Sequence, residues 1–526
     1  MRLNLKIITP TILIIYFLLG IYLSINTGIS HDEFHEQLNW EIHIKAIYEF
    51  FKSGSYDNLL NYKDRYHGVG FHLFSQPFQY IFSTPISEYL VISKYGGILL
   101  SKHIATFIIF FVSGLFFYKI CRLLINNNLF CNLSIFFYLF YPYLFGHSLF
   151  NPKDIPFLSL WVICTYFIIK ILKELYCKKK VRTKNVLILS FLTSYLISIR
   201  ITGILILVEY LVFLLVYIEN QKIKVLDFLK QNLRNIFILI ISVSIFTYLL
   251  NPVFWHNPFE LINSVSLMSK FNQNICTTTL GKCMSAQSLP ASYYFIWLFF
   301  KLPIIIIFGI ATFPFIEKKL DKEKFSKLII YSLIISFGII LIIFIIRNVA
   351  IYDELRHIMF LFPIIIITSL YFLFLFNRNV FLFLVSLSII IFIVENVKLN
   401  PYQYTWLNSF AKLTNINENF EKDYWGISNK ALNNSLIKNY NSEKTNKNIC
   451  IYGDAFSEVF LDRTSLDCFK TYSQLDEAND RPFYVIQNLR NTRRSNPKDC
   501  QLITNEKYKY FLSKQEIVLG SLWYCN

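Results

Sequence analysis

The sequence is poor in charged residues and lacks several common signatures of soluble proteins. Lys, Arg, Asp and Glu make up only 16% of its 526 residues, whereas 54% are hydrophobic and the mean hydropathy is +0.44. A soluble domain does not need so large an apolar fraction, but a helical bundle surrounded by lipid does. No Cys-x-x-Cys pair occurs, so the cysteines predict no zinc site of that kind. The composition therefore predicts a polytopic membrane protein.

Acidic residues are scarcer than basic ones, 34 against 51, which leaves a net charge of +17. In a soluble protein this charge would suggest a nucleic-acid partner. Here the basic residues lie in short loops between apolar runs, where they are typical of topology signals and of contacts with anionic lipids. We therefore expect membrane lipids as partners and no nucleic acid.

Apolar runs long enough to cross a bilayer occur throughout the first 400 residues. The first run has no small-residue cleavage site, so we expect a retained helix with a cytoplasmic N-terminus. Basic residues recur in every second connection, at 119–128, 170–184, 219–234, 317–327 and Arg378, which places these connections in the cytoplasm of a bacterial inner-membrane protein. Eleven spans are predicted: 7–24, 103–122, 129–147, 155–173, 185–199, 202–218, 235–251, 292–312, 327–346, 357–376 and 379–396.

The remaining connections fall on the extracytoplasmic side, and two of them are long enough to fold. In the first loop, 25–102, helical spacing of apolar residues predicts an amphipathic helix over 32–52 and a second one over 76–100. From about residue 445 the composition becomes that of a soluble domain, with strand-like segments at 448–453 and 482–488. The predicted fold is thus a polytopic α-helical membrane domain (1–430) of about eleven transmembrane helices. A polar stretch, 428–447, joins it to a small extracytoplasmic α/β or α+β domain (445–526).

Six of the ten cysteines lie in segments assigned to the outside, where an oxidising compartment allows pairing: Cys276, Cys283, Cys450, Cys468, Cys500 and Cys525. For Cys276 and Cys283, seven residues apart in one loop, a disulfide and two buried thiols both stay open. The other four, Cys121, Cys131, Cys164 and Cys177, lie in or near spans and are expected to be free.

A cluster of titratable residues, SHDEFHE, follows directly on the first span. The carboxylates of Asp32 and Glu33, flanked by His31 and His35, suit a general base, a metal site or both. The structural alternative is a helix start with Asp32 as N-cap and Glu36 as a first-turn acid.

Two further basic positions lie where spans meet the outside. In GHSLFNPKDIPF, Lys153 suits a phosphate and Asp154 suits an acceptor or a metal; the alternative is a turn whose lysine reaches lipid headgroups. Arg200 stands within apolar sequence, where a charge is costly unless it has a partner, and its guanidinium fork suits a phosphate. The alternative is an arginine that snorkels to the interface.

The segment YDELRHIMFLFP places Arg356 and His357 at the start of a span. This pair suits a lipid phosphate. The alternative is a surface pair between Glu354 and Arg356 that contributes little.

Together these segments resemble a GT-C-fold glycosyltransferase of the family 39 kind, which is similar to dolichyl-phosphate-mannose protein mannosyltransferases and occurs in bacteria. The resemblance covers about residues 1–430 and leaves the tail uncovered. It rests on the joint occurrence, in order, of Asp32-Glu33, HSLFNPKDIPF (147–157), SIRITG (198–203), LRHIMFLFP (355–363), NPYQYTWLN (400–408) and DYWGIS (423–428).

The resemblance implies a polyprenyl-phosphate sugar donor, an extracytoplasmic site, inversion at the anomeric carbon, and a lipid, glycan or protein as acceptor. It implies catalytic roles for three carboxylates, with Asp32 as the base: Asp32, Glu33 and Asp154. It implies donor-phosphate contacts for four basic residues: Lys153, Arg200, Arg356 and His357. A divalent metal stays open, with His31, His35 and Asp32 as candidate ligands.

Two other functions fit parts of the pattern. A ligase or polymerase of lipid-linked glycans also has many spans, but its large loop comes late in the chain, whereas here the first loop is long. A transporter or flippase of lipid-linked sugars is expected to show internal repeats and charges at mid-depth. The sequence has no such repeat, and its acidic residues gather at one surface, which favours the enzyme.

Overall fold

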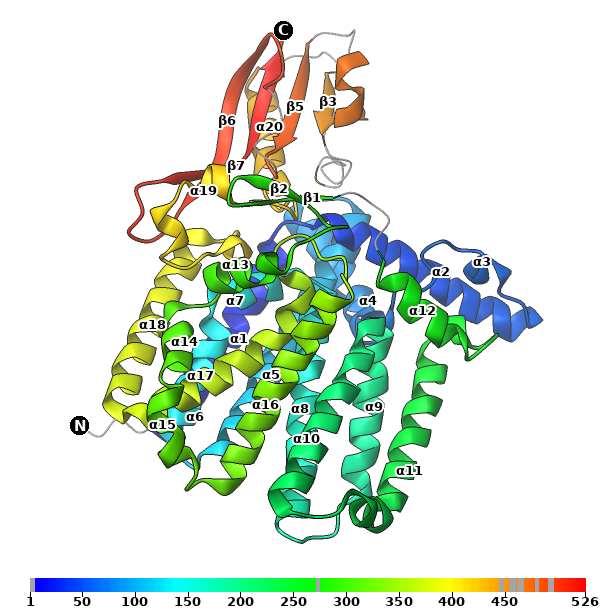
Figure 1. The fold of residues 1–526 in the computed structure, drawn as a ribbon. Helices are drawn as coiled ribbons and strands as arrows, with labels where there is room; N and C mark the ends of the chain where they lie inside the picture. The colour runs from blue at the N-terminus through cyan, green and yellow to red at the C-terminus, as the bar shows by residue number, and fades with distance from the viewer. Residues whose placement is uncertain are drawn as a thin grey trace.

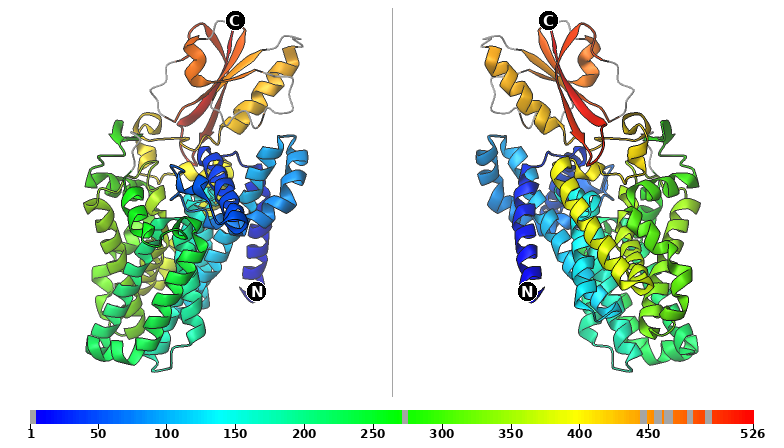
Figure 2. Two further views of the ribbon diagram at one scale, coloured as in Figure 1. Left: turned by 90° about the vertical axis from the view of Figure 1, so that its right-hand side faces the viewer. Right: turned by 90° about the vertical axis from the view of Figure 1, so that its left-hand side faces the viewer.

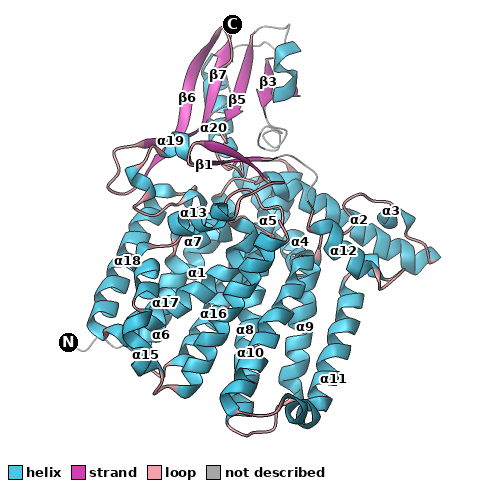
Figure 3. Ribbon diagram, viewed as in Figure 1, coloured by secondary structure: helices cyan, strands magenta, loops and turns pink. Residues whose placement is uncertain are grey.

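The computed structural model describes residues 5–270, 275–443, 449–453, 460, 468–477, 482–490 and 496–526. A bundle of long helices carries a small β-sheet domain at one end (Figure 1). Almost all strands belong to that domain, whereas the bundle itself is helical (Figure 3).

Eight helical segments among the described residues are long and apolar enough to cross a membrane. They are α1 (Leu5–Asn26), α5 (Lys94–Leu124), α8 (Asp154–Tyr176), η1 (Ile201–Leu205) with α10 (Ile206–Gln221), α11 (Val225–Leu250), α16 (Lys324–Ile346), η3 (Arg356–Leu361) with α17 (Phe362–Phe376), and α18 (Arg378–Leu399). The protein is therefore a multi-pass membrane protein, as its composition predicts.

Three of the eleven predicted spans differ from a simple long helix. Residues 129–147 form α6 (Asn128–Phe140) and α7 (Pro142–Ser148), bent by 60°, and residues 292–312 form α13 (Ala291–Lys301) and α14 (Ile304–Ala311), bent by 108°. Pro142 and Pro303 stand at the two breaks, because proline cannot donate the backbone hydrogen bond that would continue a helix. The third, α9 (Thr183–Ile199), has only 17 residues.

Short elements cover the end of the bundle next to the sheet domain (Figure 1). The predicted helix over 32–52 is α2, and the one predicted over 76–100 is present with other bounds as α4, which begins at Gly70 and ends at Leu90 before α5 starts at Lys94. The elements at this end are α2 (His31–Ser53), α3 (Asp57–Leu60), α4 (Gly70–Leu90), η2 (Pro252–Phe254), α12 (Glu260–Met268), and the hairpin of β1 (Cys276–Thr279) and β2 (Lys282–Ser285). At the opposite end of the bundle lies α15 (Phe313–Leu320).

Helix α2 begins and ends with local signals that its sequence carries. Ser30 is the N-cap, and the Glu33 carboxylate accepts hydrogen bonds from its backbone N–H (2.7 Å) and its hydroxyl. The helix ends at Gly54, whose φ of 74° is a left-handed conformation that glycine adopts without strain. The alternative that made Asp32 the N-cap is therefore wrong, and the side chain of Asp32 is left for other contacts.

The sheet domain is a five-stranded mixed sheet with strand order β4-β3-β5-β7-β6. Strand β3 runs parallel to β4 and β5, and β7 runs antiparallel to β5 and β6. Its elements are α20 (Asn429–Glu443), β3 (Cys450–Gly453), β4 (Phe469–Thr471), η7 (Tyr472–Glu477), β5 (Phe483–Asn488), β6 (Cys500–Lys509) and β7 (Glu516–Cys525). The strands expected near 448–453 and 482–488 are present as β3 and β5, although residue 448 lies outside the described residues.

The stretch 428–447, predicted to be a linker, instead contains α20. Its Leu432 and Leu436 are fully buried against Ile451 and Tyr484 of the sheet. Burial of two leucines on a strand face contributes several kcal/mol, roughly 1.5–3 for each, so α20 is a structural part of the sheet domain. Between α18 and α20 the chain forms only η4 (Gln403–Thr405), η5 (Ala411–Leu413) and α19 (Ile416–Asn419).

All six cysteines assigned to the outside are paired: Cys276 with Cys283, Cys450 with Cys468, and Cys500 with Cys525. The other four are free, and of these only Cys177 is exposed. The two views of Figure 2 show α1 running along the side of the bundle, away from the sheet domain. The disulfides therefore gather at the end of the molecule opposite the start of α1.

Candidate active site

Asp32 and Arg356 form an ion pair at the end of the bundle that faces the sheet domain. Arg356 donates from Nη1 to Asp32 Oδ2 at 2.7 Å. The arginine side chain is 2% exposed, whereas that of Asp32 is 45% exposed, so one side of the carboxylate stays open. Enclosure by protein disfavours the charge of Asp32, but Arg356 outweighs this effect and lowers the pKa of Asp32 below its ordinary value. Asp32 is therefore ionised at neutral pH.

Two aromatic rings hold the Arg356 guanidinium in place. Its central carbon lies 4.6 Å from the ring centre of Tyr352 and 4.5 Å from that of Trp425. Cation–π contacts of this kind are worth roughly 0.5–2 kcal/mol each and fix the plane of the guanidinium. Trp425 comes from the DYWGIS segment, which is far from Arg356 in the sequence and packs over it in the fold.

A second ion pair, Arg200 with Asp154, lies next to Arg356 and comes from helices of the bundle. Arg200 follows the last residue of α9 and pairs through Nη2 with Asp154 Oδ1 at the start of α8; the other Asp154 oxygen lies 3.9 Å from Arg356. Asn151 donates to Asp154 Oδ2 at 2.9 Å, and its own carbonyl accepts from two backbone N–H groups of the turn. Within the described part of the chain, Nε of Arg200 and of Arg356 are buried without hydrogen-bond partners.

Asp353 extends the site toward the sheet domain. It accepts from Arg356 Nη2 at 3.1 Å and also pairs with Arg490, which lies just beyond β5. Arg490 Nε in turn donates to Glu421 Oε1 at 2.9 Å. The result is an arginine–carboxylate chain in the order Arg200, Asp154, Arg356, Asp353, Arg490 and Glu421, with Asp32 as a branch on Arg356.

The backbone between Tyr352 and Arg356 is strained. Asp353 and Glu354 have φ values of 56° and 64°, in the left-handed region that side chains other than glycine rarely adopt. Strain of this kind costs of order 1–3 kcal/mol per residue and concentrates at functional sites. Here it lets two successive carboxylates point to different partners.

Glu354 pairs with Lys301 and not with Arg356, so the predicted surface pair is wrong. Its Oε2 lies 2.6 Å from Lys301 Nζ, and both side chains are fully buried. Tyr424 donates to the same oxygen at 3.2 Å and also lies 3.3 Å from Nε2 of His147. Burial raises the pKa of Glu354 to about 7, even though the Lys301 ammonium opposes this.

Two residues predicted to act in catalysis or phosphate binding have other partners. Glu33 is fully buried and, besides capping α2, binds His103 Nε2 at 2.9 Å, so it points away from Asp32 and Arg356. Lys153 Nζ contacts Glu36 Oε2 at 2.9 Å and the carbonyl of Gly68 at 2.6 Å. Both therefore stabilise the packing of α2 and its following loop on the bundle.

The three candidate metal ligands do not form one cluster. His31 lies against Gly426, and Asp32 is paired with Arg356. His35 instead groups with Glu36 and His67, whose ligand atoms lie within 4.8 Å of one another, and His35 Nε2 is 3.1 Å from Asp64. These donors suit a divalent ion. A cation there would compete with Lys153, which already neutralises Glu36.

His357 follows Arg356 in the chain; its ring centre is 4.6 Å from that of Tyr352, and the charges of Arg356 and Arg200 act on it. Asp32, Asp154, Arg200 and Arg356 thus come together as the sequence predicts, with His357 beside them, whereas Glu33, Lys153 and His35 have other partners. No role was predicted for Asp353, Lys301, Glu421 or Arg490. Only Asp353 had a signal, since it adjoins the LRHIMFLFP motif.

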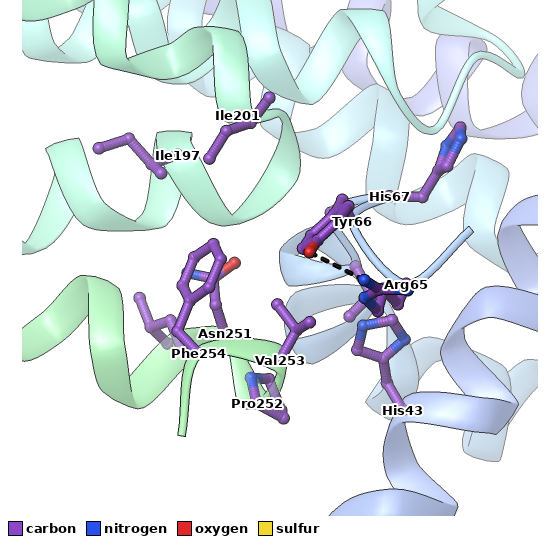
Figure 4. A pocket seen from close by; sticks show the side chains of 13 residues that line it. His43, Arg65, Tyr66, His67, Ile197, Ile201, Asn251, Pro252, Val253 and Phe254 are labelled. Carbon is purple, nitrogen blue, oxygen red and sulfur yellow. Dashed lines mark hydrogen bonds between the residues drawn. The ribbon is translucent and has the colours of Figure 1, made fainter. Parts of the chain in front are cut away.

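A separate small pocket lies between the loop that precedes α4, the start of η1 and the segment of η2 (Figure 4). One wall is polar, with His43, Arg65 and His67, and the other is apolar, with residues such as Ile201 and Val253. Burial lowers the pKa of both histidines to about 4, so they are neutral at physiological pH. None of the members of the arginine–carboxylate chain lines this pocket.

No family model and no curated protein matches the sequence. Among solved structures, the chain is similar to the crystal structure of ArnT from Cupriavidus metallidurans bound to undecaprenyl phosphate. The two chains are 10% identical with a TM-score of 0.45, over 99% of this chain and 98% of that chain.

Proposed function

We propose that this protein is a GT-C-like membrane glycosyltransferase that moves a sugar from a polyprenyl-phosphate donor to a lipid, glycan or protein acceptor. The observation that carries the proposal is the half-exposed Asp32 carboxylate, 2.7 Å from a buried arginine at the end of the transmembrane bundle. A donor anchored in lipid presents its phosphate and sugar at this depth. An acceptor can then approach from the aqueous side.

Arg356 and Arg200 would bind the donor phosphate. A guanidinium binds phosphate oxygens through two parallel N–H groups, and a site of low polarity strengthens that contact. In the structure both guanidinium groups are held by carboxylates, and both have an Nε without a partner among the described residues. A phosphodiester carries one negative charge, as the Asp32 carboxylate does. It could therefore take the place of Asp32 as the anionic partner of Arg356.

This exchange would free Asp32 to act as the base. The acceptor hydroxyl oxygen attacks the anomeric carbon, and its proton passes to the Asp32 carboxylate. The bond between the anomeric carbon and the phosphate oxygen breaks with its electron pair, so polyprenyl phosphate leaves and the anomeric configuration inverts. Arg356 and Arg200 stabilise the charge that develops on the leaving phosphate.

Asp154 would position Arg200 and Arg356 and would not itself react, because it is buried and already bound by Arg200 and Asn151. Lys153, Glu33 and His357 would support the fold around the site. We further propose that the site and the sheet domain face the extracytoplasmic side. Three disulfides support this orientation, as do the basic loops at the opposite end of the bundle.

The test is transfer of radiolabelled sugar from synthetic polyprenyl-phosphate sugars in isolated membranes, with wild type, Asp32→Asn and Glu33→Gln compared at equal protein levels. We expect label with wild type and with Glu33→Gln, and none with Asp32→Asn. The labelled product would identify the acceptor class. Absence of label with every donor would refute the transferase proposal and favour a transporter of lipid-linked sugars.

A further inference from the structure

Among the described residues of the sheet domain, Arg490 alone enters the arginine–carboxylate chain. It comes two residues after the end of β5, and its side chain is 26% exposed, whereas its two carboxylate partners, Asp353 and Glu421, are 5% and 0% exposed. Arg490 therefore extends from the sheet domain to two buried acids outside it, and these ion pairs differ from an exposed pair at the surface. Its loss would leave buried charge uncompensated.

The backbone that carries Arg490 is fixed on both sides. Its N–H donates to Asn488 Oδ1 at 2.9 Å, and the N–H of Leu489 donates to the Leu519 carbonyl of β7 at 2.8 Å. Asn488 also donates to Asp423 at 3.0 Å, next to the Tyr424–Trp425 segment that packs on Arg356. The sheet domain therefore delivers the Arg490 guanidinium to one defined position.

The charge balance at Arg356 depends on Arg490. Three carboxylates surround Arg356: Asp32 at 2.7 Å, Asp353 at 3.1 Å and Asp154 at 3.9 Å. Asp154 is shared with Arg200, and Asp353 is shared with Arg490. Without Arg490, Asp353 would pair with Arg356 alone. Arg356 would then bind an incoming anion less tightly.

We propose that the sheet domain supplies, through Arg490, the cation that neutralises Asp353 and so keeps Arg356 available for the donor phosphate, while Glu421 holds Arg490 in place. Arg490 is thus a positioning residue of the phosphate site, and the sheet domain is part of that site. The inference rests on the proposed function, because it assumes that Arg356 binds the donor phosphate.

The electrostatic surroundings of the two acids agree with this role. Burial raises the pKa of Asp353 above its ordinary value and that of Glu421 to about 8, and in both cases Arg490 is the largest effect in the opposite direction. The other charged or titratable groups that act on them are Arg356, Asp32 and His31 for Asp353, and Asp353 and Glu354 for Glu421. Lys301 and Tyr293 also face Glu421.

The experiment measures binding of undecaprenyl phosphate to the purified full-length protein by thermal-shift titration between pH 5.5 and 8.5. It compares wild type with Arg490→Gln, Arg490→Lys and the control Lys507→Gln. Lys507 pairs with Glu516 on the exposed side of the sheet domain, so its substitution removes an ion pair of that domain without touching the site.

We expect Arg490→Gln to weaken binding about tenfold at pH 8, which is the order of effect of one charge-assisted contact. Arg490→Lys should recover part of the lost affinity. Lys507→Gln should bind as tightly as wild type. The loss of affinity in Arg490→Gln, taken relative to wild type at the same pH, should shrink as the pH falls, because protonation of Asp353 then removes the charge that Arg490 neutralised. If Arg490 had a purely structural role, the loss of affinity in Arg490→Gln would not change with pH.

Equal affinity of wild type and Arg490→Gln, or a deficit constant with pH, would overturn the inference and leave the proposed transferase intact. If wild type itself does not bind undecaprenyl phosphate, the proposed phosphate site is wrong and the inference fails with it. The two failures are therefore distinguishable in one titration.

Discussion

Asp32→Asn should separate catalysis from donor binding more clearly than any other single substitution. Loss of a general base costs about 10²–10⁴-fold in rate, so we expect kcat to fall by that factor. The same substitution removes the carboxylate that occupies Arg356 at 2.7 Å. An exposed ion pair is worth up to about 1 kcal/mol, and Asp32 is 45% exposed. Donor binding should therefore become tighter, by at most about fivefold.

The assay is steady-state sugar transfer with varied donor concentration, together with direct titration of the donor lipid. Glu33→Gln is the matched control, because it alters the neighbouring carboxylate, which binds Ser30 and His103 and not Arg356. We expect that control to lower thermal stability, by about 1–3 kcal/mol for a perturbed buried contact, and to leave kcat within a few-fold. A kcat for Asp32→Asn within tenfold of wild type would refute the base assignment. Weaker donor binding in that variant would refute the exchange at Arg356.

Three further predictions follow from the site and the topology. Arg356→Met should raise the donor KM by at least about tenfold, measured in the same assay, and an unchanged KM would remove Arg356 from the phosphate site. Because burial raises the Glu354 pKa to about 7, protonation of Glu354 stabilises the fold below its ordinary pKa, and this contribution is lost as the pH rises through 7. Glu354→Gln should therefore flatten the pH dependence of thermal unfolding between pH 5 and 8, and an unaltered slope would contradict the burial argument. Cys177, the exposed free cysteine, should react with a membrane-impermeant maleimide in inverted vesicles but not in intact cells, and the reverse result would invert the proposed orientation.

The sequence predicts the membrane helices well because each span needs a continuous run of apolar residues, which can be recognised from the local sequence alone. All eleven predicted spans coincide with helices; two of them are bent where proline interrupts the backbone, at Pro142 and Pro303, and a third, α9, is short. The wrong linker over 428–447 has another cause. Helix α20 buries only a few apolar side chains, such as Leu432 and Leu436, against a sheet whose strands follow it in the sequence. A polar stretch with so few apolar contacts cannot be told from a linker without its tertiary partners.

The site was predictable only where charge stands next to apolar sequence. Charged residues lie near the ends of spans at four positions: Asp32, Asp154, Arg200 and Arg356. A charge next to the apolar core is costly unless it has a partner or a function. Glu33 shows the limit of that reasoning, since adjacent carboxylates point about 100° apart on a helix and only one of them can face the site. Arg490 gave no signal at all, because it stands in a polar, basic run that is typical of a solvated loop.

The strand order of the sheet domain also determines when the site can be completed during synthesis. Strand β7, residues 516–525, lies between β5 and β6, and its Leu519 carbonyl binds the N–H of the residue before Arg490. A ribosome that has made all the helices of the bundle, and even Arg490 itself, has not yet made the strand that fixes Arg490. If Arg490 acts as proposed, the phosphate site would reach its full affinity only after translocation and folding of β7, so the nascent chain would bind donor lipid more weakly while its helices are still being inserted.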